Sequence, residues 1–153
     1  MIAIEYRELP IEEIDKIKPL WEKIKIHHYE RATVFKADFE KVTFSERKRK
    51  ISMGKKEVRI IVAQDGNTSQ IVGYCLSSIS QDDVGEVDSL YIEEKFRRLG
   101  IGKELMRRTL EWFNENGIQE IIIALALGNE EALPFYEQFG FAPRTYILKQ
   151  KPV

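Results

Sequence analysis

A short turn with two glycines is the part of this sequence whose residues are best suited to chemistry. The turn reads Arg97-Arg98-Leu99-Gly100-Ile101-Gly102-Lys103 and joins a strand-like run to a helix-like run. Two glycines one residue apart let the backbone come close to a ligand and present successive N–H groups to it. The positive end of the following helix and three basic side chains add to the attraction for anions. The sequence therefore predicts a phosphate or pyrophosphate site here.

Two other phosphate-binding motifs do not fit this turn. A dinucleotide-binding loop would have its third glycine where Leu105 stands. A phosphate-binding loop of an NTPase would have Ser or Thr after its lysine, whereas Glu104 follows Lys103. A tight connection between strand and helix, with solvated arginines and no ligand, is the alternative interpretation.

The runs beside the turn are typical of a strand before it and a helix after it. Residues 86–92 are of types that pack well in a sheet, and 103–116 carry apolar residues at helical spacing. Toward the N-terminus, 2–7 alternate like a strand. Residues 11–30 have a helical pattern, and we expect Pro19 to break it or to open a second helical piece.

The remaining runs complete an alternation of strands and helices. A capping box, Thr43-Phe44-Ser45-Glu46, opens a short basic helix that stops near Gly54. Asn129 is predicted to cap a helix that continues to Phe139, with Pro134 inside it. Further strands are predicted at 58–63, 71–79, 120–127 and 144–149, of which 120–127 is apolar enough to be buried on both faces. This order favours an α/β or α+β domain built on a mixed sheet.

Composition excludes several classes of function. With 24 basic and 25 acidic residues the net charge is −1, so we expect no nucleic-acid partner and no attraction to an anionic membrane. The one cysteine, Cys75, excludes an internal disulfide and a cysteine-based zinc site, and its apolar run predicts that it is buried. His27 and His28 are adjacent and have no third histidine to complete a metal site. Neither a signal peptide nor a membrane span is predicted, and a cytoplasmic location is expected.

Two segments together resemble the GNAT superfamily of N-acetyltransferases. Arg97-x-x-Gly100-x-Gly102 is similar to the motif with which that family binds the pyrophosphate of acyl-CoA. Asn129-x-x-Ala132-x-x-Phe135-Tyr136-Glu137-x-x-Gly140-Phe141 is similar to the segment after its splayed fifth strand. The run 87–92 also looks like its bulged fourth strand. The resemblance implies a mixed, mostly antiparallel sheet flanked by helices, with splayed fourth and fifth strands forming the CoA cleft.

The same resemblance implies an acetyl-CoA site without a metal. Backbone N–H groups of 98–103 would hold the pyrophosphate, and the backbone of 90–92 would pair with the pantetheine arm like an added strand. Asn129 would contact the pantetheine or an ordered water, and Tyr136 would face the sulfur. The expected cofactor-binding residues are Leu90, Tyr91, Ile92, Arg97, Arg98, Leu99, Gly100, Ile101, Gly102, Lys103, Asn129 and Tyr136.

The reaction implied is direct attack of a primary amine on the acetyl thioester, without a covalent enzyme intermediate. An alkyl amine has a pKa of about 10.4 and is mostly protonated at neutral pH, so a carboxylate must take its proton. Glu86 and Asp88 are both candidates for this base. A tyrosine hydroxyl, with a pKa of about 10, can donate to the leaving thiolate, and Tyr136 is the family-matching choice. Backbone N–H groups near the strand bulge could stabilise the oxyanion.

We predict a single acetyltransferase domain over residues 1–153. Within it, 1–56 would form the acceptor side, 57–141 the acetyl-CoA-binding core and 142–153 a C-terminal strand. The acceptor is not identified, and a small-molecule amine is favoured over a protein. A non-catalytic acyl-CoA-binding or regulatory module of the same fold is the alternative. Members of the family often form dimers, so a homodimer stays open.

Overall fold

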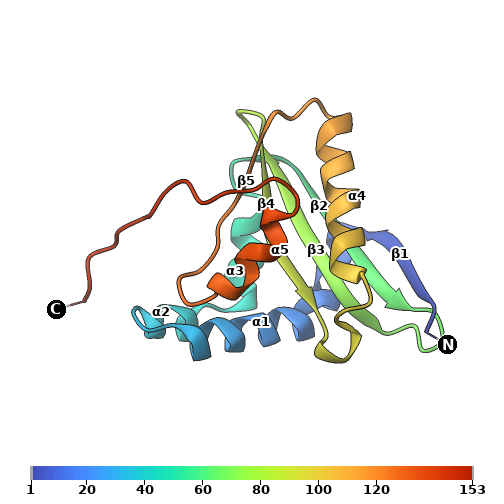
Figure 1. Cartoon of the computed structure of the whole chain (residues 1–153), viewed down its shortest axis with the longest axis horizontal. Helices are drawn as coiled ribbons and strands as arrows, with labels where there is room; N and C mark the ends of the chain where they lie inside the picture. Colours follow the sequence, from blue (N-terminus) through green and yellow to red (C-terminus); the bar gives the residue numbers. More distant parts are fainter. Residues whose placement is uncertain (1, 153) are drawn as a thin grey trace. The chain divides into compact units, whose positions relative to one another are not determined.

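The computed structural model describes residues 2–152 and contains a five-stranded sheet in the order β1-β2-β3-β4-β5 (Figure 1). Neighbouring strands are antiparallel from β1 to β4, whereas β4 and β5 are parallel. This is the mixed, mostly antiparallel sheet that the sequence predicted. The strands are β1 (Ile4–Leu9), β2 (Lys55–Asp65), β3 (Ile71–Ser80), β4 (Val84–Ile92) and β5 (Glu120–Ile123).

Local sequence explains where two of the helices begin. Pro19 is the second residue of α1, where its missing N–H costs no helical hydrogen bond, so it opens a second helical piece. Thr43 Oγ1 accepts a hydrogen bond of 3.2 Å from the N–H of Glu46, which confirms the capping box at the start of α3. The helical elements are η1 (Ile11–Ile17), α1 (Lys18–Arg31), α2 (Lys36–Lys41), α3 (Phe44–Ile51), η2 (Glu94–Phe96), α4 (Ile101–Glu115), η3 (Glu130–Ala132) and α5 (Leu133–Glu137).

The described chain packs as two compact units. The first unit contains residues up to 24 together with 43–124, and therefore the whole sheet with η1, α3, η2 and α4. The second unit contains 25–42 together with the residues from 125 onward, and therefore the end of α1 with α2, η3 and α5.

One face of the sheet in the first unit is covered by η1, the start of α1 and α3. Buried side chains of these helical elements pack with β-strand residues of alternate positions, as expected for a strand with one face toward each layer. Trp21 and Phe44 meet edge to face, with ring centroids 5.3 Å apart. The cluster consists of Leu9, Ile14, Ile17, Leu20, Trp21, Phe44, Ile51, Ile60, Val62, Tyr74 and Leu76.

Helix α4 covers the other face, where it packs on β2, β3 and β4. Its buried stripe includes Leu105, Met106 and Phe113. Thr109 Oγ1 donates to the carbonyl of Leu105 at 2.9 Å and lies 3.3 Å from Cys75 Sγ. Cys75 is buried, as predicted.

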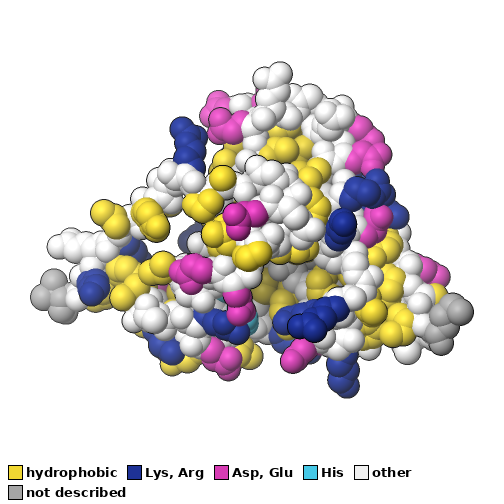
Figure 2. All heavy atoms as spheres, viewed as in Figure 1, with side chains coloured by type: hydrophobic (Ala, Val, Ile, Leu, Met, Phe, Trp, Pro, Cys, Tyr) yellow, Lys and Arg dark blue, Asp and Glu magenta, His cyan; other side chains and the backbone are white. Residues whose placement is uncertain are grey.

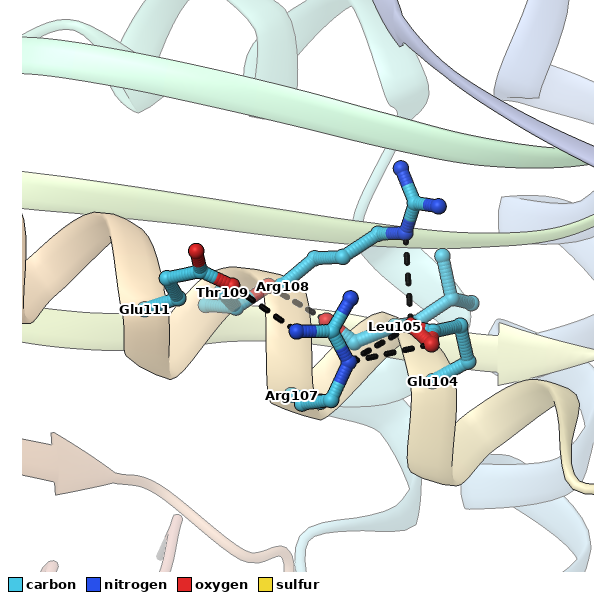
Figure 3. A network of polar contacts seen from close by, with 6 residues as sticks. All are labelled: Glu104, Leu105, Arg107, Arg108, Thr109 and Glu111. Carbon is cyan, nitrogen blue, oxygen red and sulfur yellow. Dashed lines mark hydrogen bonds and ion pairs between the residues drawn. The ribbon is translucent and has the colours of Figure 1, made fainter.

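The opposite side of α4 carries a network of charged side chains. Figure 3 shows Glu104 accepting hydrogen bonds from Arg107 and Arg108, while Arg107 also reaches Glu111. Arg108 lies over the ring of Tyr6 in β1, 4.8 Å from its centroid. These spacings of three and four residues place the charges side by side on the helix surface.

Replacing Gly85 by alanine is expected to destabilise the protein by about 1–3 kcal/mol. A Cβ at Gly85 would lie 2.8 Å from Cε1 of Phe113 and 2.9 Å from its Cδ1. The Phe113 ring is fully buried, so it cannot move aside without disturbing the core. The free energy of unfolding in urea measures the effect. In a double variant with Phe113→Leu the two losses should be less than additive, whereas full additivity would contradict the proposed clash.

Three elements predicted near the C-terminus differ in the structure. One strand is shorter than predicted, one helix is divided, and one strand is absent from the described residues. The strand predicted at 120–127 is only β5, and Ile122 is 44% exposed, so β5 is not buried on both faces. The helix predicted at 129–139 is divided into η3 and the short α5, and Pro134 lies in the first turn of α5, where it is tolerated.

Within the described chain, the predicted C-terminal strand at 144–149 does not form. Tyr146, Ile147 and Leu148 are 89–93% exposed, and Figure 2 shows hydrophobic side chains along this stretch. Alternation of apolar and polar residues predicts a strand, but a strand forms only where its backbone finds a partner.

Candidate functional site

The glycine turn opens α4 in an unusual backbone conformation. Arg98 has a φ of 64° and Gly100 a φ of 79°, both in the left-handed region. Gly100 is the N-cap of α4 and has no side chain with which to cap it. The N–H groups of the first turn of α4 therefore face the end of the helix without a capping side chain. The positively charged end of the helix and the exposed Arg97 and Arg98 make this turn electropositive.

Strand β4 has a bulge immediately before the segment predicted to bind pantetheine. Leu76 pairs with Ser89, whereas the next residue of β3, Ser77, pairs with Val87, so Asp88 is the extra residue. The pairing between β4 and β5 ends at Val87 and Ile123, although β4 continues to Ile92. The bulge and the splaying of these two strands, both implied by the resemblance, are confirmed.

The hydrogen-bond pattern decides which backbone groups of β4 face away from β3. The N–H of Glu93 donates to the carbonyl of Val72 at 2.8 Å, which makes these two residues a hydrogen-bonded pair. Such pairs alternate along an antiparallel ladder, so Tyr91 bonds to β3 while the N–H and C=O groups of Leu90 and Ile92 point to the opposite edge. The backbone of Tyr91 therefore faces β3, and its side chain packs against the buried cluster of the first unit.

Arg97 has a structural contact that the sequence did not indicate. Its Nε donates to the carbonyl of Ile92 at 3.0 Å, and its guanidinium lies 5.3 Å from the centroid of the Tyr91 ring. One outward-facing backbone group of β4 is thus already satisfied within the chain. Arg97 joins the end of β4 to the glycine turn.

The two candidate bases differ in their surroundings. Asp88 accepts a hydrogen bond of 2.7 Å from Ser78 Oγ, and burial raises the pKa of its carboxyl to about 6 although this hydrogen bond opposes the shift. Glu86 lies 3.4 Å from Lys55 Nζ, and both side chains are partly exposed. Burial thus brings the pKa of the Asp88 carboxyl toward neutral pH.

The polar side chains that surround the bulge of β4 were not predicted from the sequence. Arg47 of α3 donates to the backbone carbonyl of Asp88 at 3.3 Å, and the hydroxyl of buried Tyr74 lies 2.6 Å from Ser89 Oγ. Burial raises the pKa of Tyr74 well above its usual value. Tyr74 and Ser78 are polar residues inside the apolar run of β3. Because buried polar groups need hydrogen-bond partners, these two residues could have indicated polar contacts near the bulge.

The second unit contains the other two predicted site residues. Asn129 was predicted to cap a helix, but its side chain makes no cap bond, and its Oδ1 instead accepts a hydrogen bond of 3.0 Å from His27 Nε2. Tyr136 lies on α5 beside two aromatic rings, with centroid distances of 5.2 Å to Phe135 and 6.5 Å to Phe141. The glycine turn, the β4 edge and both carboxylates belong to the first unit.

Among residues 2–152 there is no group of three or more His, Cys, Asp or Glu side chains arranged to hold a metal ion. The helices of this same stretch are too short or too polar to cross a membrane.

The fold and the glycine turn together define an acetyltransferase-like protein. The sequence model of the acetyltransferase (GNAT) family matches residues 18–141. The chain therefore belongs to the GNAT acetyltransferase family, as its two motifs predicted.

Curated relatives match the chain over shorter segments. An uncharacterized N-acetyltransferase of Methanocaldococcus jannaschii is 25% identical over 72 residues, which are 47% of this chain and 32% of that protein. N-alpha-acetyltransferase 30 of Schizosaccharomyces pombe is 35% identical over 57 residues, 37% of this chain and 38% of that protein. The match thus spans only about a third of the length of each relative.

Solved structures share the fold over nearly the whole chain. A putative acetyl transferase from Pyrococcus furiosus has a TM-score of 0.78 and 24% identity, covering 99% of this chain and 100% of that one. An aminoglycoside N-acetyltransferase solved in complex with CoA has a TM-score of 0.70 and 12% identity, covering 99% and 96%. At these identities the likeness concerns the fold.

Proposed function

We propose that this protein transfers an acetyl group from acetyl-CoA to a primary amine of a small molecule, by direct attack of the amine on the thioester. The observation that carries the proposal is the course of β4. This strand bulges at Asp88, continues beyond its pairing with β5, and leads through η2 into the glycine turn that opens α4. A ligand lying along β4 would thus meet hydrogen-bonding backbone first and an anion-binding turn next.

The donor would be bound mainly by backbone groups. The N–H groups of residues 98–103 would hold the pyrophosphate at the start of α4. The N–H and C=O of Leu90 and the N–H of Ile92 would pair with the amide groups of pantetheine, as in the addition of a strand. Arg97 would support this edge through its bond to the carbonyl of Ile92. Membership in the acetyltransferase family, and the CoA complex of an aminoglycoside N-acetyltransferase with this fold, support acetyl-CoA as the ligand.

The chemical step would require one base and one acid. Asp88, directly or through a water, would take the proton of the ammonium group, so that the amine nitrogen can attack the acetyl carbonyl carbon. Backbone N–H groups at the bulge would stabilise the oxyanion. As the carbon–sulfur bond breaks, Tyr136 would give its proton to the CoA thiolate. The nitrogen of the new amide would lose its second proton, which would restore the tyrosine hydroxyl through solvent. Glu86 remains the second candidate for the base.

A screen of amines tests the proposal and its alternative together. We expect release of CoA thiol from acetyl-CoA with at least one amine in a panel of aminoglycosides, polyamines, amino sugars, free amino acids and peptides with a free N-terminus. Direct attack predicts that acetyl-CoA alone leaves the intact protein mass unchanged. Binding of acetyl-CoA without turnover on any amine would favour the non-catalytic acyl-CoA-binding module.

The panel also addresses the class of acceptor. Aminoglycoside acetyltransferases and a glucosamine-6-phosphate N-acetyltransferase are among the proteins with this fold, which supports a small-molecule amine. The name N-alpha-acetyltransferase 30 among the relatives makes peptide N-termini the main competitor in the screen. A cytoplasmic location and a homodimer are compatible with this function and stay predictions.

If Asp88 is the base, activity should depend on pH through its carboxyl. The base acts only when ionised, so kcat/KM is expected to rise with pH through about 6, the raised pKa of Asp88, and then to level off. Asp88→Asn should remove this rise and lower kcat/KM about tenfold at neutral pH, with a smaller loss at alkaline pH, where more of the amine is already neutral. Glu86→Gln is the matched control and should retain the rise. A rise that persists in Asp88→Asn and disappears in Glu86→Gln would assign the base to Glu86.

A further inference from the structure

We propose that Ser78 is a positioning residue for the proton transfer from the amine, because its hydroxyl holds the Asp88 carboxylate at one oxygen and leaves the other oxygen to accept the proton. The inference rests on the proposed function, in which Asp88 is the base. Both residues, and the charged groups around them, belong to the first unit.

Ser78 is a fully buried residue of β3 whose hydroxyl bonds to the bulge of β4. Because its side chain has no access to water, this hydroxyl needs a partner within the protein. Across the ladder Ser78 pairs with Glu86, whereas Asp88 is the extra residue of the bulge. Ser78 Oγ donates to Asp88 Oδ2 at 2.7 Å, a distance typical of a hydroxyl bonded to a charged carboxylate. The buried serine and the bulge thus meet at the Asp88 carboxyl.

The charged groups around Asp88 contact other atoms. Arg47 of α3 donates to the backbone carbonyl of Asp88 at 3.3 Å, and Lys55 at the start of β2 lies 3.4 Å from Glu86. Both cations favour an ionised Asp88 carboxyl, whereas Glu86 on the same strand disfavours it. The Cys75 thiol of β3 is a further ionisable neighbour, but burial raises its pKa, so it is uncharged near neutral pH.

The hydroxyl of Ser78 favours the form of Asp88 that can act as a base. Burial raises the pKa of Asp88 to about 6 although the hydrogen bond from Ser78 lowers it, so without this hydroxyl the pKa would be higher still. Asp88 is only partly buried, and a carboxylate held at Oδ2 can accept a proton at Oδ1. Ser78 therefore keeps the base ionised at the pH at which it must act.

The first test follows the Asp88 carboxyl by carbon-13 NMR titration of the protein without ligand, so it needs no acceptor amine. Ser78→Ala should move the titration midpoint of Asp88 from about 6 to about 7 or above, because a hydrogen bond to a charged group is lost. Ser78→Thr keeps a hydroxyl and should keep the midpoint near its original value. Ser77→Ala is the matched control, since it removes a buried hydroxyl that lies 3.5 Å from Cys75 Sγ, and it should leave the midpoint unchanged.

The second test measures kcat/KM against pH with an amine found in the screen. With a midpoint of about 7, about a tenth of the carboxyl is ionised at about pH 6 instead of about half, so Ser78→Ala should lower kcat/KM about fivefold there. At about pH 8.5 the carboxyl is ionised in both proteins, and the difference should be about twofold or less. A serine needed only for structure would lower kcat/KM to the same extent at every pH.

Failure of this inference can be separated from failure of the proposed function. If Asp88→Asn removes the rise of kcat/KM with pH while Ser78→Ala moves neither the midpoint nor the rise, Asp88 stands as the base and the role of Ser78 is wrong. The same midpoint shift in Ser77→Ala, or an equal loss of activity at every pH, would also overturn the role of Ser78. If the midpoint moves in Ser78→Ala but the rise does not, Asp88 is not the base, and the inference fails together with that assignment.

Discussion

Replacing Gly102 with glutamate is expected to abolish acetyl-CoA binding and to leave the protein folded. Gly102 is the second residue of α4, next to the N–H groups proposed to hold the pyrophosphate. A glutamate there would place a carboxylate against the phosphates, so both bulk and charge oppose the ligand. We expect the Kd measured by calorimetry to rise at least about a hundredfold, which corresponds to about 2.7 kcal/mol. Glutamate in the first turn is compatible with the helix and its dipole, so the thermal midpoint should change little.

Two companion variants separate the causes of this loss. Asn114→Glu adds the same charge at an exposed position near the other end of α4 and should leave the Kd unchanged. Gly102→Ala adds a small side chain without charge, and a loss of affinity well below that of Gly102→Glu would show that charge dominates. An unchanged Kd in Gly102→Glu would mean that the glycine turn is not the cofactor site.

The sheet and the helices of the first unit were predictable because each carries a local signal. Helical spacing of apolar residues predicted α4, and the capping box at Thr43 predicted the start of α3. Pro19 predicted a boundary within the helical run 11–30. The sequence alone could not decide whether the helix breaks there or a second helix begins there. The bulge at Asp88 came from the family resemblance, since no single residue type specifies a bulge.

The errors fall where structure depends on a partner distant in sequence. The run 120–127 is apolar after Glu120, yet only its first half pairs with β4, because the two parallel strands diverge after Ile123. Residues 144–149 alternate as a strand should, but no described strand pairs with them. Periodicity reports which face of a segment is apolar and does not report whether a neighbour is present.

The site was predicted as a set of residues and not as a set of contacts. The sequence singled out Arg97, Asp88 and Asn129 as site residues. It did not indicate the residues with which their side chains form hydrogen bonds in the structure. Arg97 bonds the carbonyl of Ile92, Asp88 is bonded by Ser78, and Asn129 is bonded by His27. The contact from His27 to Asn129 spans 102 positions, so no local pattern could have indicated it. Such pairings follow from the fold and must be taken from the structure.

Tyr136→Phe should lower kcat much more than it changes the affinity for acetyl-CoA. The substitution removes only the hydroxyl and keeps the ring that packs beside Phe135 and Phe141, so folding and cofactor binding should persist. Without a proton donor the departing thiolate must leave as an anion or take its proton from water, and we expect kcat to fall about a hundredfold, within the range for general acid catalysis. The measurement is steady-state thiol release with an amine found in the screen, together with the Kd of acetyl-CoA.

Tyr146→Phe provides the matched control, because it removes a tyrosine hydroxyl that is 89% exposed within the same unit. We expect it to leave kcat unchanged. Equal falls in kcat and in affinity for Tyr136→Phe would indicate a role in binding the cofactor rather than in the chemical step. An unchanged kcat would leave Tyr136 as an aromatic packing residue and require another group to protonate the thiolate. A large fall in kcat with an unchanged Kd is the result that only a group acting in the transition state produces, because acetyl-CoA bound in the ground state does not yet need the proton.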